Sequence, residues 1–133
     1  MEERARIMKI ASLKFSTEEP SFYNVQIDED GNVYYYNEKG HLHRLDGPAI
    51  EYANGSKEWI IESKHHRLDG PAVEWRNGYK EWYYKGKRHR LDGPAIEWPD
   101  GDKWWYVNNE LIGKSREGFT QRKFEQWKRK HGL

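Results

Sequence analysis

The sequence predicts an all-β protein: a single-layer antiparallel meander of about six to eight strands, built from 23-residue repeats and followed by a short C-terminal helix. The heptapeptide HRLDGPA occurs three times, and its copies start at His43, His66 and His89. An Asn-Gly or Asp-Gly turn signal recurs after each copy. Aromatic residues make up 15% of the 133 residues, which argues against a disordered chain.

The composition excludes several classes of protein. Hydrophobic residues are 35% of the chain and charged residues 34%, so a large aliphatic core is not expected. No apolar run approaches the roughly 18 residues of a membrane span, and the N-terminal residues do not resemble a signal peptide. The chain has no cysteine, which excludes disulfides and fits a cytoplasmic location. A net charge of +1 gives no bulk attraction to nucleic acid or membranes.

We divide the chain into an N-terminal segment (1–20), a repeat array (21–112) and a C-terminal capping helix (113–133). Residues 2–15 fit either a short helix or an edge strand, and residues 18–21, Glu-Glu-Pro-Ser, are typical of a linker. A degenerate copy of the repeat precedes the three clear ones. It runs from Asp30 to His43 and has one inserted residue.

Each repeat should contain a β-hairpin with a three-residue loop. A two-residue loop at Asn77-Gly78 would place Glu74 opposite Glu81, and two like charges would then face each other. A type I turn followed by a left-handed glycine places Glu74 opposite Lys80 instead, and Pro99 in the third copy suits such a turn. The same register pairs Glu51 with Lys57 and Glu97 with Lys103.

The alternation of side chains along strands predicts two aromatic faces. One face should carry Tyr52, Trp75 and Trp98, with the aliphatic residues at 50, 73 and 96. The other should carry the tryptophans at 59, 82 and 105 beside three alanines. A second, tight turn is expected at residues 84–87, before the chain enters the next HRLDGPA segment.

The last copy departs from the pattern and should close the array. Trp104 stands where the other copies have glutamate, and residues 108–112 replace the second turn and the His-Arg pair. A helix should start after an N-cap at Thr120, with Phe119 and Phe124 packing together. Helical spacing places Phe124, Trp127 and His131 on one face, and the helix should cap the sheet or cover an aromatic stripe.

The segment W-x-x-x-G-K-x-H-R-x-D-G-P-A, at residues 82–95, resembles the MORN-type repeats of tailed bacteriophages and giant viruses. Standard MORN repeats usually have glycine after the histidine, where this chain has Arg44, Arg67 and Arg90. The resemblance covers residues 30–112 and extends to the closing KFEQWKRKHG segment. It implies a repeat architecture and carries no fixed activity, although such arrays are associated with protein interaction and lipid binding.

Five of the six histidines lie near the repeat junctions, at positions 41, 43, 65, 66 and 89. Equivalent residues of a meander lie two strands apart, about 9.5 Å, whereas zinc–nitrogen bonds are about 2 Å long. We therefore expect no metal site and no cofactor, and expect each histidine to pack at a turn and bond to the backbone.

The repeated arginines and aspartates also favour a structural role over catalysis. A catalytic site requires one preorganised set of residues, and three identical copies are instead typical of a scaffold. We expect the arginines to pair with acidic groups on a neighbouring strand and the aspartates to hold the turns. These structural residues are Arg44, Asp46, Arg67, Asp69, Arg90 and Asp92.

The sequence predicts a non-enzymatic protein–protein interaction module, and the resemblance implies a phage protein that acts on a host protein, for example by inhibiting a defence or regulatory enzyme. The predicted partner-binding residues are Trp104, Trp105, Tyr52, Trp75 and Trp98. The alternative is nucleic-acid or nucleotide binding through aromatic and basic side chains. Residues 111–133 have a net charge of +5, and the predicted basic patch is Arg122, Lys123, Lys128, Arg129 and Lys130. An exposed sheet edge could also allow self-association.

Overall fold

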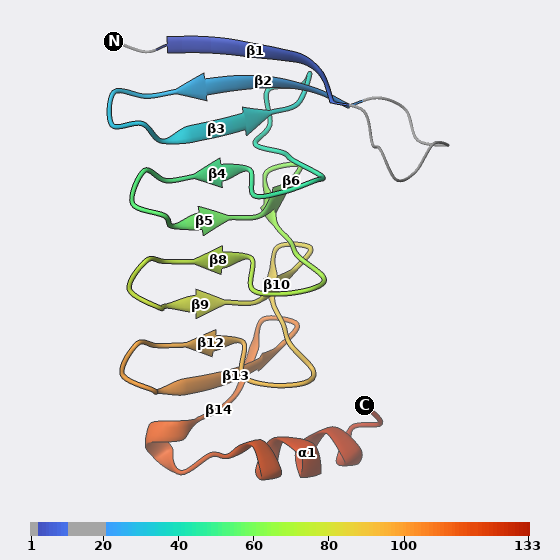
Figure 1. The fold of residues 1–133 in the computed structure, drawn as a ribbon. Helices are drawn as coiled ribbons and strands as arrows, with labels where there is room; N and C mark the ends of the chain where they lie inside the picture. The colour runs from blue at the N-terminus through green and yellow to red at the C-terminus, as the bar shows by residue number, and fades with distance from the viewer. Residues whose placement is uncertain (1–2, 11–20) are drawn as a thin grey trace. The chain divides into compact units, whose positions relative to one another are not determined.

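The computed structural model describes residues 3–10 and 21–133. The chain divides into two compact units, Met1–His65 and His66–Leu133, and the boundary falls inside the predicted repeat array. Antiparallel strands dominate both units, and one α-helix of ten residues is present among the described residues, after the last strand (Figure 1). The predicted all-β meander with a C-terminal helix is therefore confirmed.

In the first unit, five strands form an antiparallel meander in chain order, and a separate two-stranded hairpin follows. The meander consists of β1 (Glu3–Ile10), β2 (Ser21–Ile27), β3 (Val33–Tyr36), β4 (Ile50–Glu51) and β5 (Lys57–Glu58). The hairpin consists of β6 (Ile60–Ile61) and β7 (Lys64–His65). Of the two structures that the sequence left open for the N-terminal segment, residues 3–10 adopt the strand. The predicted linker lies, apart from Ser21, outside the described residues.

The second unit repeats this plan and ends in a helix. Its meander consists of β8 (Val73–Glu74), β9 (Lys80–Glu81), β12 (Ile96–Glu97), β13 (Lys103–Val107) and β14 (Glu110–Lys114). Its separate hairpin consists of β10 (Tyr83–Tyr84) and β11 (Lys87–Arg88). A 3-10 turn, Ser115–Glu117, leads to helix α1 (Gln121–Lys130). No helix in the described part of the chain is long and apolar enough to cross a membrane.

The predicted three-residue loops are confirmed in all three clear copies. Glu51 is opposite Lys57, Glu74 is opposite Lys80, and Glu97 is opposite Lys103. The glycine that ends each loop has a φ between 94° and 99°, in the left-handed region that glycine adopts without strain. The degenerate copy forms the same loop, because Gly31 has a φ of 87° and its N–H donates to the Asp28 carbonyl at 3.1 Å.

Each tight second turn uses two residues in the left-handed region, which identifies a type I′ hairpin turn. The residue pairs are Glu62-Ser63, Lys85-Gly86 and Asn108-Asn109. In the middle copy this turn joins β10 to β11, as the sequence predicted for residues 84–87. In the last copy β13 continues into the turn without a break, and β14 pairs with it. This longer pairing closes the array.

Helix α1 packs its apolar face on the end of the second unit (Figure 1). The Thr120 hydroxyl accepts the Lys123 N–H at 3.2 Å, which confirms the predicted N-cap. Phe124 is fully buried with Trp105 and Val107 of β13, and Phe119 and Trp127 pack against the same cluster. Trp127 also stacks on the His131 ring at 4.2 Å, as the helical spacing predicted.

Candidate functional site

The arginine of each HRLDGPA segment holds its loop together. Arg90 lies over the Trp82 ring, with 3.9 Å between Cζ and the ring centroid. Its Nε donates to Asp92 at 2.8 Å, and its Nη1 donates to the Pro94 carbonyl at 3.0 Å and to Glu97 at 3.2 Å. The other two copies repeat these contacts: Arg44 hydrogen-bonds to Asp46 and Pro48 and forms an ion pair with Glu51, and Arg67 hydrogen-bonds to Asp69, Pro71 and Glu74.

This arrangement confirms the predicted arginine–acid pairs and refines the role of the aspartates. The glutamate partner lies on the strand that follows each loop, as expected for pairing with a neighbouring strand. Each aspartate holds the loop by binding its arginine, and the Arg90 hydrogen bond lowers the pKa of Asp92. The loop glycine leaves room for the guanidinium group, because a Cβ on Gly93 would lie 2.8 Å from the Arg90 Cζ.

The histidine of each HRLDGPA segment accepts a hydrogen bond from a backbone N–H 19 residues further along the chain. The three pairs are His43 with Glu62 at 3.0 Å, His66 with Lys85 at 2.9 Å, and His89 with Asn108 at 3.0 Å. Because the accepting atom is Nδ1, that nitrogen must be unprotonated. Each histidine thereby fixes a type I′ turn, which confirms the predicted backbone bonding at these three positions.

We expect these three histidines to make the folded chain less stable below about pH 6.5, the ordinary histidine pKa. Burial lowers the pKa of His43, His66 and His89, so the unfolded chain binds protons at a pH where the folded chain does not. The stability that the three neutral histidines contribute is complete above their pKa in the unfolded chain. It is lost as the pH falls through their lower pKa in the folded chain. Urea unfolding of the wild type should show a falling midpoint between pH 7 and pH 5.

The matched variant is His43→Asn/His66→Asn/His89→Asn, because asparagine Oδ1 occupies the place of Nδ1 and does not titrate. Its urea midpoint should change less than that of the wild type over the same pH range. Equal pH dependence in the two proteins would contradict this role of the histidines.

The side chains of the other two junction histidines bind carboxylates, partners that the sequence did not predict. His41 Nδ1 lies 3.0 Å from Glu62 Oε1, and His65 Nε2 lies 2.6 Å from Glu58 Oε1. Among the described residues, no three histidine or acidic side chains converge as a metal site requires.

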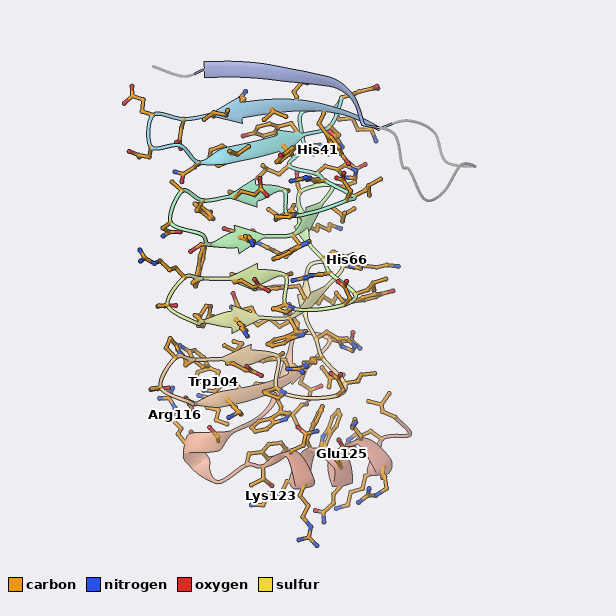
Figure 2. All side chains as sticks on the ribbon, viewed as in Figure 1. His41, His66, Trp104, Arg116, Lys123 and Glu125 are labelled. Carbon is orange, nitrogen blue, oxygen red and sulfur yellow. The ribbon has the colours of Figure 1, made fainter. Side chains whose placement is uncertain are left out.

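The predicted aromatic binding residues are largely engaged in packing. Trp98 lies between Tyr79 and Trp104, with ring centroids 5.6 and 4.5 Å away. Trp104, which is labelled in Figure 2, is half-buried. Lys114 Nζ lies 4.0 Å from its ring centroid. The structure thus brings Trp98 and Trp104 together, while Trp75 is half-buried in the same unit. Tyr52 belongs to the first unit, where its hydroxyl donates to Glu58 at 2.5 Å.

Trp104 is further fixed by Asp102, whose side chain is mostly buried at the end of the array. The Ser115 hydroxyl donates to this carboxylate at 2.6 Å, the Trp104 indole at 2.8 Å and the Arg116 Nη2 at 2.9 Å. These hydrogen bonds, that of Ser115 above all, lower the pKa of Asp102 to about 2. The arrangement fits a structural end cap.

Trp105 does not have the exposed surface that partner binding requires. Only 2% of it is exposed, because Phe119 and Phe124 cover its ring and its Nε1 donates to Gln121 at 2.9 Å. The prediction that it contacts a partner is therefore corrected: Trp105 attaches the helix to β13.

The leucines of the HRLDGPA segments are the residues that sequence analysis missed. Leu45, Leu68 and Leu91 are 58%, 80% and 40% exposed, although folding normally buries leucine. The available signal was an apolar residue that recurs between charged neighbours in a predicted turn. The fold does not need an apolar residue at so exposed a position, yet leucine occupies it in all three copies.

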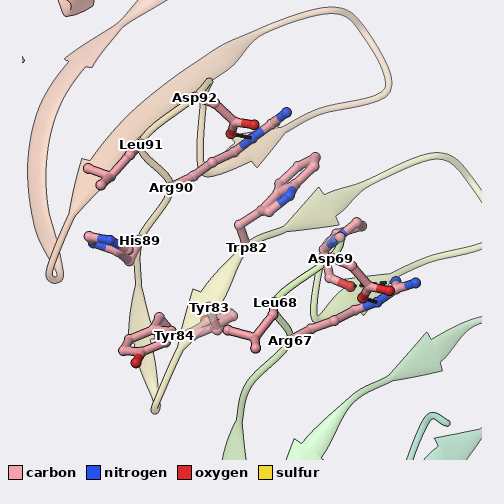
Figure 3. A pocket seen from close by; sticks show the side chains of 12 residues that line it. Arg67, Leu68, Asp69, Trp82, Tyr83, Tyr84, His89, Arg90, Leu91 and Asp92 are labelled. Carbon is pink, nitrogen blue, oxygen red and sulfur yellow. Dashed lines mark hydrogen bonds and ion pairs between the residues drawn. The ribbon is translucent and has the colours of Figure 1, made fainter. Parts of the chain in front are cut away.

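Two of these leucines line a groove in the second unit, which we call the leucine groove (Figure 3). Its volume is about 610 Å³, within the range of ligand sites. One wall is the loop 67–71, the other is the segment 89–92, and Trp82, Tyr83 and Tyr84 lie between them. Asp69 and Asp92 belong to the two walls, and their side chains are 87% and 85% exposed.

The predicted basic patch is present on helix α1 with one exception. Arg122, Lys123, Arg129 and Lys130 are exposed and share the outer face of the helix. Lys128 lies on the inner side, where its Nζ donates to the Leu91 carbonyl at 2.6 Å and pairs with Glu125 at 3.0 Å. Four cations therefore form the exposed patch.

Comparisons of the chain with protein-family models, curated proteins and solved structures found no match.

Proposed function

We propose that this chain is a non-enzymatic protein–protein interaction module and that the leucine groove is its binding surface. The observation that carries this proposal is the exposure of the repeated leucines, above all Leu68 at 80%. Exposed apolar side chains that line a groove are typical of interaction sites, because a partner can remove them from water. Aromatic residues in the same groove provide the large contact areas that dominate binding energy.

The polar side chains of the repeat support an interaction role over a catalytic one. His66 and His89 use Nδ1 to fix turns, and Arg67 and Arg90 each bind two carboxylates and a carbonyl. These groups support the walls of the groove. The leucines and Tyr84 are left to contact a partner.

The resemblance to MORN-type repeats of tailed bacteriophages supports a bacterial host protein as the partner, with the complex formed in the host cytoplasm. Such a protein would act by occupying a surface of its target, for example of a defence or regulatory enzyme. Because the groove is small, it would form the centre of a larger interface.

The proposal predicts that Leu68→Ser/Leu91→Ser loses its captured partner while remaining folded. Both side chains are exposed, so each substitution should change the free energy of unfolding by no more than about 0.5 kcal/mol. Affinity capture from host lysate, with the bound protein identified by mass spectrometry and then purified, should give a complex that the variant weakens at least about tenfold.

The matched control is Leu111→Ser/Leu133→Ser, which replaces two exposed leucines outside the groove. This variant should keep the partner. Equal loss in both variants would show general surface stickiness, and no loss in the groove variant would remove the groove from the interface. Trp104→Ala, examined in parallel, tests the aromatic surface that the sequence suggested.

The basic face of α1 supports nucleic-acid binding as a second candidate function. Four exposed cations on that face could contact phosphates. The affinity of such a complex would fall steeply as salt is added. For four contacts to a single strand, a plot of log affinity against log salt concentration should have a slope of about −3. A complex formed through the leucine groove should survive the same increase in salt.

A further inference from the structure

One residue of the first unit shows what fits beside an HRLDGPA loop. Tyr23 is buried, and its hydroxyl oxygen accepts the Leu45 N–H at 2.9 Å. Its ring lies edge-on to Tyr35, with 5.9 Å between centroids, and 6.5 Å from the His43 ring. A tyrosine of the chain itself therefore lies beside this loop, where its neighbours are an aromatic ring, a histidine ring and a backbone N–H.

The leucine groove contains the equivalents of all three contacts, namely Trp82, His89 and Leu91. The two sets of residues correspond in geometry as well as in their positions in the repeat. Arg44 lies 4.0 Å from the Tyr35 ring centroid, and Arg90 lies 3.9 Å from that of Trp82. His43 and His89 also accept the same backbone hydrogen bond. The framework around Tyr23 is thus repeated in the second unit.

The tyrosine itself is not repeated. Gly70 corresponds to Tyr23 when the chain is counted back three residues from Val73 and Gln26, which are equivalent paired positions in their hairpins, and Gly70 lines the groove without a side chain. Arg67 takes part of the room, because its Cζ lies 2.9 Å from where a Gly70 Cβ would stand. The Leu91 N–H makes no hydrogen bond with the described part of the chain, whereas the equivalent N–H of Leu45 binds Tyr23.

We propose that the leucine groove binds a tyrosine side chain of the partner protein, an inference that rests on the proposed function. The ring contacts Trp82 and His89, and the phenol oxygen accepts the Leu91 N–H. Tyrosine suits such a site because it combines a large apolar ring with one polar end. Asp69 and Asp92 are exposed while Arg67 and Arg90 are paired, so an unmodified phenol is preferred to phosphotyrosine.

The test is a titration of the full ¹⁵N-labelled chain with N-acetyl-tyrosinamide, followed by NMR. The Leu91 amide and the Trp82 indole signals should shift saturably, with a dissociation constant of roughly 1–10 mM for one side chain. N-acetyl-phenylalaninamide should bind about tenfold more weakly, because it lacks the hydrogen-bonding oxygen. The phosphotyrosine analogue should also bind more weakly.

Gly70→Tyr provides a second test, because it restores a tyrosine at the position of Tyr23. Arg67 must shift its flexible end, and the variant should then lose binding of the tyrosine compound. Absence of shifts at Leu91 in the wild type, or equal binding of the phenylalanine compound, would overturn the proposal.

These results separate the two proposals. If Leu68→Ser/Leu91→Ser abolishes partner capture but N-acetyl-tyrosinamide does not bind, the interaction module stands and tyrosine recognition fails. If the variant keeps its partner and N-acetyl-tyrosinamide does not bind, both proposals fail.

Discussion

Phe124→Ala is expected to lower the free energy of unfolding of the second unit by about 3–5 kcal/mol. Phe124 is fully buried between the helix and β13, where Trp105 and Val107 line its site. Removing the ring leaves a cavity under α1 and exposes Trp105 to water. The loss must come from packing, because alanine has a higher helix propensity than phenylalanine. Urea unfolding monitored by tryptophan fluorescence measures it.

The matched control is Arg122→Ala, two positions away on the exposed face of the same helix. It should change the free energy of unfolding by less than about 0.5 kcal/mol. If Phe124→Ala proved as mild as this control, the helix would not be the cap that closes the second unit.

Glu81→Ala is expected to destabilise the second unit by about 2–3 kcal/mol, the cost of leaving charged hydrogen-bonding groups without their partner. Glu81 is buried, and it accepts hydrogen bonds from Arg88 Nε at 2.7 Å and from the Tyr83 hydroxyl at 3.1 Å. Without the carboxylate, the half-buried Arg88 lacks this acceptor. The measurement is again the urea midpoint, with circular dichroism to confirm the fold.

The double variant Glu81→Leu/Arg88→Leu should lose less stability than Glu81→Ala, because an apolar pair leaves no charge without its partner. The repeat itself supports this expectation: Trp104 and Leu111 occupy the equivalent positions in the last copy. A double variant less stable than Glu81→Ala would show that the ion pair has no apolar substitute here.

The sequence alone determined the hairpins and the helix. The like charges at Glu74 and Glu81 excluded the two-residue loop, and the left-handed glycine required the three-residue one, so the register followed from local chemistry. The N-cap at Thr120 and the aromatic spacing that follows it determined the helix in the same way. These features depend on residues within about ten positions of each other, which is why the pattern was sufficient.

Only the tertiary structure decided which surfaces remain exposed. Trp105 is buried by a helix that starts 16 residues later in the chain. The hydrogen bond from the Leu45 N–H to Tyr23 joins residues that are 22 positions apart. The open groove at Leu68 and Leu91 likewise depends on two loops from successive repeats. Such contacts carry no local periodic signal, because burial and access depend on how distant segments pack together.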